Sequence, residues 1–263
     1  MKVYVLSENT ASAEGFACEH GLSLYIEFAG KRLLFDTGAS SVFAENAAKL
    51  GVDLSKVDAC ILSHGHQDHG GGLAKFMELN ATAPIYVQRQ AFVSHFNDAD
   101  KDISIEPQLQ ASARIVYVDD TLELGEHMLI DCKPVAVPAY AVNAYGLQMC
   151  KGGTLKPDDF LHEQYLVLEE QGRRVLFSGC SHRGILNLLQ WFQPDVVIGG
   201  FHFFKLRLEE SKDRAYLQTA AKLLQQTGGE LYTCHCTGIP QYAFLKESLP
   251  ELKYLAAGAV IEL

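Results

Sequence analysis

The sequence has no apolar run long enough to cross a membrane, since a transmembrane helix needs about 20 such residues in succession. The stretch Met1 to Glu8 meets an acidic residue too early to form the apolar core of a secretory signal. Positive charge is also scarce, because 22 Lys and Arg stand against 32 Asp and Glu, for a net charge of −10. Phosphate backbones attract basic proteins, so this balance argues against nucleic acid as a partner. We therefore expect a cytoplasmic protein with a small-molecule substrate and neither a membrane nor a nucleic-acid partner; a homodimer is left open.

Cysteine is too rare and too irregular for a disulfide framework. The chain has seven cysteines in 263 residues, an odd number that suits free thiols in a reducing compartment. Hydrophobic residues make up 48% and charged residues 21%, as in ordinary globular proteins, and the length can bury a sizeable core. We see no linker, and we expect a single domain over residues 1–263.

What the chain has instead is an unusual concentration of histidine and glycine at residues 63–72, Ser-His-Gly-His-Gln-Asp-His-Gly-Gly-Gly, directly after the apolar run 59–62. Neutral imidazole is the commonest ligand for zinc, and a carboxylate adds charge. In an extended loop the rings of His64 and His66 point to one side. Asp68 and His69 then face a second ion about 3.5–4 Å away. We expect two divalent ions, zinc by default, although these ligands also suit iron and manganese.

The pattern His64-x-His66-x-Asp68-His69 resembles the signature of the metallo-β-lactamase fold superfamily. The resemblance implies an α/β (α+β) fold, a four-layer αββα sandwich of two mixed sheets flanked by helices, with the metal site at one edge of the sheets. The order of predicted elements fits, because strand, turn, strand, polar loop and helix occur twice, at 22–50 and at 165–192.

Two stretches have weak periodicity. Residues 90–113 predict a helix and an irregular insertion placed as a lid over the site. Residues 138–162 predict a long loop, and loops of this length are usually functional or disordered.

The resemblance also implies further ligands at later strand ends: a third histidine, an aspartate that often bridges the metals, and a final histidine. His235 follows a predicted strand and is expected as the final ligand. Cys180 occupies the position of the usual aspartate, and it is either a ligand or a neighbouring redox-active thiol. His162 is our choice for the third histidine, with Asp158 and Asp159 as competitors for the same role.

Other polar residues have expected roles near this centre. Asp36 ends a predicted strand and is expected to orient a ligand by hydrogen bonding. We expect Asp68, His182 and His202 to take part in catalysis, with His182 acting as a ligand, an acid or a substrate-binding residue. We place His20 at the rim, interpret His95 and His127 as surface residues, and expect a phosphorylated substrate to meet the basic residues Arg183, Lys205 and Arg207.

A wider set of motifs is similar to the branch named after 7,8-dihydropterin-6-yl-methyl-4-(β-D-ribofuranosyl)aminobenzene 5′-phosphate synthase. The set comprises residues 19–23, 34–38, 63–72, 178–185, 198–202 and 235–238. Our leading hypothesis is a hydrolase that acts on a small phosphorylated or ester substrate through a metal-bound hydroxide. The alternatives are the synthase, a transferase that the branch name implies and that expels pyrophosphate from a pterin, and a metal- or thiol-based redox sensor.

Overall fold

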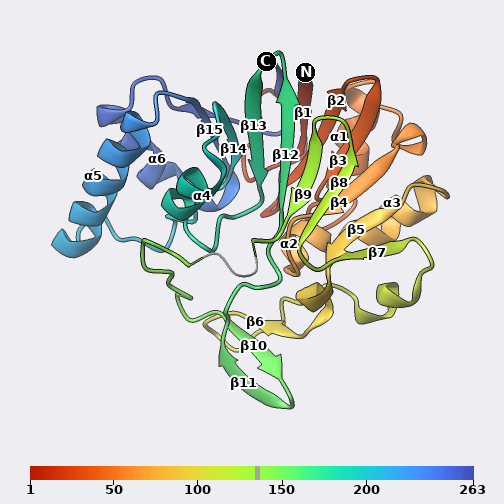
Figure 1. Cartoon of the computed structure of the whole chain (residues 1–263), viewed down its shortest axis with the longest axis horizontal. Helices are drawn as coiled ribbons and strands as arrows, with labels where there is room; N and C mark the ends of the chain where they lie inside the picture. The colour runs from red at the N-terminus through yellow and green to blue at the C-terminus, as the bar shows by residue number, and fades with distance from the viewer. Residues whose placement is uncertain (134–136) are drawn as a thin grey trace.

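The computed structural model describes residues 1–133 and 137–263, with two seven-stranded sheets at its centre (Figure 1). The first sheet, in spatial order, consists of β17 (Val260–Glu262), β1 (Lys2–Ser7), β2 (Ser23–Phe28), β3 (Lys31–Phe35), β4 (Ala59–Leu62), β5 (Ile85–Gln88) and β7 (Ile115–Val118). The second consists of β16 (Lys253–Tyr254), β15 (Glu230–Thr233), β14 (Val196–Gly199), β13 (Arg173–Ser178), β12 (Tyr165–Glu170), β9 (Met128–Asp131) and β8 (Thr121–Gly125). Both sheets mix parallel and antiparallel pairs.

The helices are α1 (Val42–Lys49), α2 (Gln67–Gly70), α3 (Leu73–Leu79), α4 (Ile185–Phe192), α5 (Ser211–Gln226) and α6 (Ile239–Ser248), with short 3₁₀ helices η1 (Leu54–Lys56), η2 (Arg89–Phe92), η3 (Pro107–Ala111) and η4 (His235–Thr237). The longer helices pack on the outer faces of the sheets, whereas α2 and η4 carry His69 and His235 in the loops at the sheet edge. In α5 the buried residues Leu217, Ala221 and Leu224 recur at helical spacing and form its core-facing stripe. None of the helices in the described ranges is long and apolar enough to span a bilayer.

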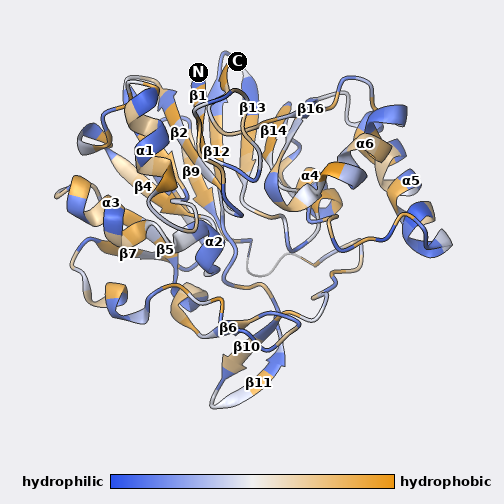
Figure 2. Cartoon of the chain, turned by 180° about the vertical axis from the view of Figure 1, so that it is seen from behind, coloured by the Kyte–Doolittle hydropathy of each residue, from blue (hydrophilic) through white to orange (hydrophobic). Residues whose placement is uncertain are grey.

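Alternation along the strands divides the apolar side chains into three layers. In β3, Leu33 and Phe35 face the second sheet, whereas Leu34 packs under α1 and α3. In β13, Phe177 faces the first sheet, and its ring centroid lies 6.1 Å from that of Phe35. Leu176, one residue earlier, packs under α4 and α5. Figure 2 shows the hydrophobic colour along the central strands. The predicted arrangement of two mixed sheets between helices is confirmed.

The parallel strands send their polar loops to one edge of this sandwich. β3 and β4 run parallel in the first sheet, as do β13, β14 and β15 in the second. Because the carboxyl ends of parallel strands share an edge, the loops after residues 35, 62, 178, 199 and 233 lie on the same side of their sheets. These loops carry the histidine, aspartate and cysteine residues that the sequence marked as candidate ligands.

The two weakly periodic stretches form only part of what the sequence predicted, because residues 90–113 are the expected irregular insertion but lack its helix. Residues 90–113 contain η2, η3 and the short strand β6 (His95–Phe96), with no α-helix. The predicted long loop contains a hairpin of β10 (Gln148–Lys151) and β11 (Thr154–Pro157), and β10 pairs with β6 in a third, small sheet (Figure 1). The two differences have separate causes. β6 is stabilised by pairing with the distant β10, so its own sequence shows little periodicity. β10 and β11 form a local hairpin across Gly152 and Gly153.

Candidate metal centre

The loops of the two sheets meet in a buried cluster of histidine, aspartate and cysteine. One group of four, which we call the Cys180 group, consists of Asp68, His69, Cys180 and His235. His69 Nε2 lies 3.2 Å from both Cys180 Sγ and His235 Nε2. His235 Nε2 is also 3.2 Å from Asp68 Oδ2. Ligands bound at about 2.0–2.3 Å in a tetrahedron stand roughly 3.3–3.7 Å apart, so these separations suit a single zinc-sized cation.

A second group, which we call the His182 group, consists of the buried residues His64, His66 and His182. The Nε2 atoms of His64 and His182 are 3.3 Å apart. The ring centroid of His66 lies 4.6 Å from that of His64 and 4.9 Å from that of His182. Three converging imidazoles match the donor number of a zinc site that keeps one position open. The sequence left His182 open as a ligand, an acid or a substrate-binding residue, and the structure places its ring beside His64 and His66.

His162 is buried beside this group but its ring nitrogens face other partners. Its Nδ1 accepts the Gly65 N–H at 3.0 Å, and its Nε2 lies 3.2 Å from Asp158 Oδ1. A neutral imidazole has one lone pair, and here Gly65 uses it. The spacing before Cys180 indicated that His162 is near the site but could not show this orientation. Asp158 is buried with His162, whereas Asp159 forms an ion pair with Lys151 outside the cluster.

Several buried partners orient the donor side chains. Asp36 accepts hydrogen bonds from the Ser63 N–H at 2.6 Å, from Ser63 Oγ at 2.7 Å and from His69 Nδ1 at 2.7 Å. The sequence predicted that Asp36 orients a ligand by hydrogen bonding, and its partner His69 is one of the expected ligands. On the opposite side, Asn9 Oδ1 accepts from His235 Nδ1 at 2.8 Å. Each contact fixes one ring nitrogen as a donor and leaves Nε2 to face the Cys180 group.

Glu163, which no motif in the sequence marks, holds the loop after β13. Its buried carboxylate accepts the backbone N–H groups of His182 and Arg183 at 2.8 and 3.1 Å, and the Tyr165 hydroxyl at 2.6 Å. Burial raises the pKa of Glu163 despite these bonds. The role of Glu163 could not be predicted from the sequence, because its partners His182 and Arg183 lie in a distant loop.

Left-handed backbone conformations mark the same loops. Asp36, Ser181, His202 and His235 have φ values of 61°, 55°, 55° and 47°. Non-glycine residues rarely adopt this region, and such strain clusters at functional sites. The surrounding hydrogen bonds stabilise these conformations and thereby point the side chains inward.

The electrostatics of the cluster favour cation binding. Burial, together with neighbouring imidazoles, lowers the pKa of His64 and of His182 well below the usual value, so both rings are neutral and offer a lone pair at pH 7. Burial alone would raise the pKa of Asp68, but the imidazoles around it, His69 first, hold it well below its usual value. Burial and then Cys236 raise the pKa of Cys180, so its thiolate form depends on a bound cation.

A pocket of about 400 Å³ opens above the cluster. Its lining residues are His20, Ala39, His66, Gln67, Asp68, Asn97, Asp98, Lys101, Ile103, Tyr145, Leu147, Cys180, His182, His202, Phe204, Lys205 and Cys236. The ring of His202 lies next to that of His182, with centroids 4.3 Å apart. Burial first, and the neighbouring His66 second, lower the pKa of His202 to about 3. His20 lies at the exposed rim, 3.3 Å from Asp68 Oδ2. The volume suits a small molecule.

Three sequence-based placements differ from the structure. Arg183 is buried and donates to the carbonyl oxygens of Cys132 and Lys133. Arg207 pairs with Glu210. Neither arginine lines the pocket. Lys101 lines it in their place, beside Lys205. His95 is fully buried, although we expected it at the surface; His127 is exposed as expected.

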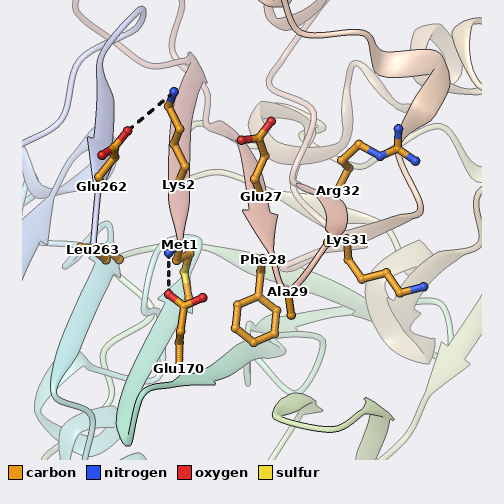
Figure 3. A pocket seen from close by; sticks show the side chains of 11 residues that line it. Met1, Lys2, Glu27, Phe28, Ala29, Lys31, Arg32, Glu170, Glu262 and Leu263 are labelled. Carbon is orange, nitrogen blue, oxygen red and sulfur yellow. Dashed lines mark hydrogen bonds and ion pairs between the residues drawn. The ribbon is translucent and has the colours of Figure 1, made fainter.

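A second hollow of about 550 Å³ lies at the opposite ends of the strands (Figure 3). It surrounds Met1, at the start of β1, and Lys31, at the start of β3. Two ion pairs lie in it, between the Met1 amino group and Glu170 and between Lys2 and Glu262. Among the residues that the structure describes, its lining contains no histidine or cysteine, so we assign the chemistry to the pocket above the cluster.

Close packing behind the centre predicts a cost for adding a single methyl group at Gly179. A Cβ there would lie 2.2 Å from Ser63 Oγ and 3.1 Å from His64 Nδ1. Because Asp36 fixes Ser63, we expect Gly179→Ala to lower the free energy of unfolding by about 1–3 kcal/mol in urea titrations. An unchanged free energy of unfolding would show that Ser63 can move aside.

Comparisons with known proteins match part of the chain in one case and nearly all of it in the others. Residues 17–139 match the family model described as the metallo-beta-lactamase superfamily. A 7,8-dihydropterin-6-methyl-4-(beta-D-ribofuranosyl)-aminobenzene-5′-phosphate synthase from Methanocaldococcus jannaschii is 27% identical, covering 100% of this chain and 96% of the relative. An uncharacterized protein of the same organism is 26% identical over 98% of this chain and 99% of its own. A solved structure described as a metal-dependent hydrolase of the beta-lactamase superfamily superposes with a TM-score of 0.84 at 27% identity, covering 100% of this chain and 99% of that one.

Proposed function

We propose that this chain, which belongs to the metallo-β-lactamase superfamily, is a metal-dependent hydrolase of a small phosphorylated or ester substrate. The observation that carries the proposal is the convergence of two donor groups at the floor of one pocket. The His182 group would hold one divalent ion and the Cys180 group another, with zinc the best match to the imidazole and thiol donors. Such ions supply Lewis acidity and an activated water at neutral pH.

The chain's own residues have separate tasks in this scheme. Asp36 and Asn9 keep His69 and His235 in their ring orientations. His202 faces the pocket as a neutral imidazole, suited to hydrogen bonding with a substrate. Lys101 and Lys205 give the wall positive charge for an anionic group, and Lys205 Nζ now pairs with Asp98 Oδ2 at 2.7 Å. The apolar side of the pocket, including Tyr145 and Phe204, accommodates the uncharged part of the substrate.

A second candidate function is the synthase reaction named for the Methanocaldococcus jannaschii relative, whose similarity extends over the whole chain. In that case the same centre would favour departure of pyrophosphate from a pterin-like substrate. The two functions are separated by one assay set on metal-loaded protein. Release of an alcohol from model carboxylic esters or phosphodiesters, or of phosphate from model phosphomonoesters, abolished by a chelator, supports the hydrolase. Pyrophosphate release that requires both a dihydropterin pyrophosphate and an amine acceptor, with no ester hydrolysis, supports the synthase.

Lys205 should contribute mainly to substrate binding. Losing one charged hydrogen bond costs about 1.5 kcal/mol, so Lys205→Ala is expected to raise KM for a phosphorylated substrate roughly tenfold with little change in kcat. Arg207→Ala is the matched control, because Arg207 pairs with Glu210 and does not line the pocket. Equal effects of the two substitutions would argue against a binding role for Lys205.

A further inference from the structure

Behind the His182 group lies a second set of buried residues, in which Asp158 contacts three imidazoles. His95 Nδ1 is 2.9 Å from Asp158 Oδ2, and His162 Nε2 is 3.2 Å from Oδ1. His66 Nε2 lies 3.7 Å from Oδ2. All four side chains are at least nine-tenths buried. Neither Asp158 nor His95 has a task in the proposed hydrolase mechanism.

The hydrogen atoms in this set can be assigned from its contacts. His162 Nδ1 accepts the Gly65 N–H, so its hydrogen is on Nε2 and is donated to Asp158. A carboxylate only accepts, so His95 donates from Nδ1 to the same residue. Two of the three imidazoles are therefore donors to Asp158. This arrangement leaves too few lone pairs for a metal site made of all four residues.

The remaining imidazole is the one that also belongs to the metal centre. The Nε2 atom of His66 is buried, has no hydrogen-bond partner within the described part of the chain and faces Asp158. A histidine that ligates through one ring nitrogen carries its hydrogen on the other and usually donates it to a carboxylate. His66 Nε2 faces Asp158 Oδ2 at 3.7 Å, which is longer than a hydrogen bond, so a small turn of the ring is needed to complete such a pair.

The small third sheet brings this carboxylate into position. His95 lies in β6 and pairs with Met149 of β10, and Asp158 directly follows β11. The Asp158 N–H donates to Leu147 O at 3.0 Å, and Asp158 Oδ1 accepts the Phe160 N–H at 2.8 Å. The insertion also contacts the histidine loop, since Gln67 donates its N–H to Ile103 O at 2.7 Å. The third sheet thus connects the insertion to the metal centre.

We propose that Asp158, held by His95 and His162, is a positioning residue that orients the ring of His66 and so sets the cation affinity of the His182 group. The Cys180 group has its own orienting partners, Asp36 and Asn9, and does not depend on Asp158. The proposal therefore predicts an effect confined to one of the two donor groups.

Cobalt(II) titration of the metal-free protein tests this selectivity. Cobalt bound by Cys180 gives a thiolate charge-transfer band, which reports the Cys180 group separately from total cobalt bound per chain. We expect Asp158→Asn to weaken one equivalent by about 10–100-fold while the thiolate band titrates as in the wild type. Asp159→Asn is the matched control, because Asp159 is its exposed neighbour and pairs with Lys151; it should change neither equivalent.

A second variant keeps the test decisive if Asp158→Asn does not fold. His95→Gln retains a hydrogen-bond donor and is expected to weaken the same equivalent by a smaller factor. Unchanged cobalt affinity in the folded variants would overturn the proposal, as would equal weakening of both equivalents or a protein that binds no cobalt. If the wild type binds three cobalt equivalents and Asp158→Asn loses only the third, then Asp158 and its imidazoles form a separate metal site. That result would also overturn the positioning role.

Discussion

A His64→Ala variant is expected to lose one metal equivalent per chain and to hydrolyse its substrate roughly 10³-fold more slowly than the wild type. His64 faces His182 with ring nitrogens 3.3 Å apart, and its removal leaves the His182 group with two imidazoles. A catalytic metal contributes several kcal/mol of charge stabilisation, and each 1.36 kcal/mol is a factor of ten in rate. Metal analysis and kcat/KM measured on the same preparation test both parts.

His127→Ala is the control for this experiment, because the side chain of His127 is 64% exposed and does not line the pocket above the cluster. It should retain full activity and metal content. If His64→Ala keeps both, the metal-dependent mechanism proposed for this chain is wrong.

Asp36→Ala should cause a large loss of stability. The buried carboxylate accepts three hydrogen bonds, two from Ser63 and one from His69, and bulk water cannot reach this fully buried position to replace it. We expect the free energy of unfolding to fall by about 3–5 kcal/mol, as when one partner of a buried charged pair is removed. Urea unfolding monitored by circular dichroism would measure the change.

Asp58 provides the comparison for Asp36. Its carboxylate accepts hydrogen bonds from Arg32, but its side chain is 33% exposed, so water can replace the lost contacts in Asp58→Ala. We expect a loss of about 1 kcal/mol or less. Similar losses for the two substitutions would mean that burial does not determine the role of Asp36.

Most of the sandwich could be predicted from local sequence. Strands 31–35 and 173–178 are short and bounded by turns, and their apolar residues 33–35 and 175–177 are buried on both faces, which makes them recognisable in the sequence. The third sheet could be predicted only in part. β10 pairs with β11 across the adjacent turn at Gly152 and Gly153, which is a local hairpin signal. β6 has two residues and pairs with β10 about 50 residues later in the chain, so local sequence does not mark it.

The candidate site was predictable where a motif lies on a strand end. His64, His66, Asp68 and His69 occupy one loop, and the structure brings them together with Cys180 and His235 from the second sheet. The choice between His162 and His182 was not predictable, because spacing does not give ring direction. His95 gave no signal either, since its burial depends on the pairing of β6 with β10.

The central claim is that two donor groups bind two cations at the floor of the pocket, and anomalous scattering from crystals of the metal-loaded protein tests it most directly. Data collected on both sides of the metal absorption edge identify the element and locate each ion. We expect one peak among His64, His66 and His182, and a second among Asp68, His69, Cys180 and His235. A single peak bound by His162, or no peak within the cluster, would contradict the claim.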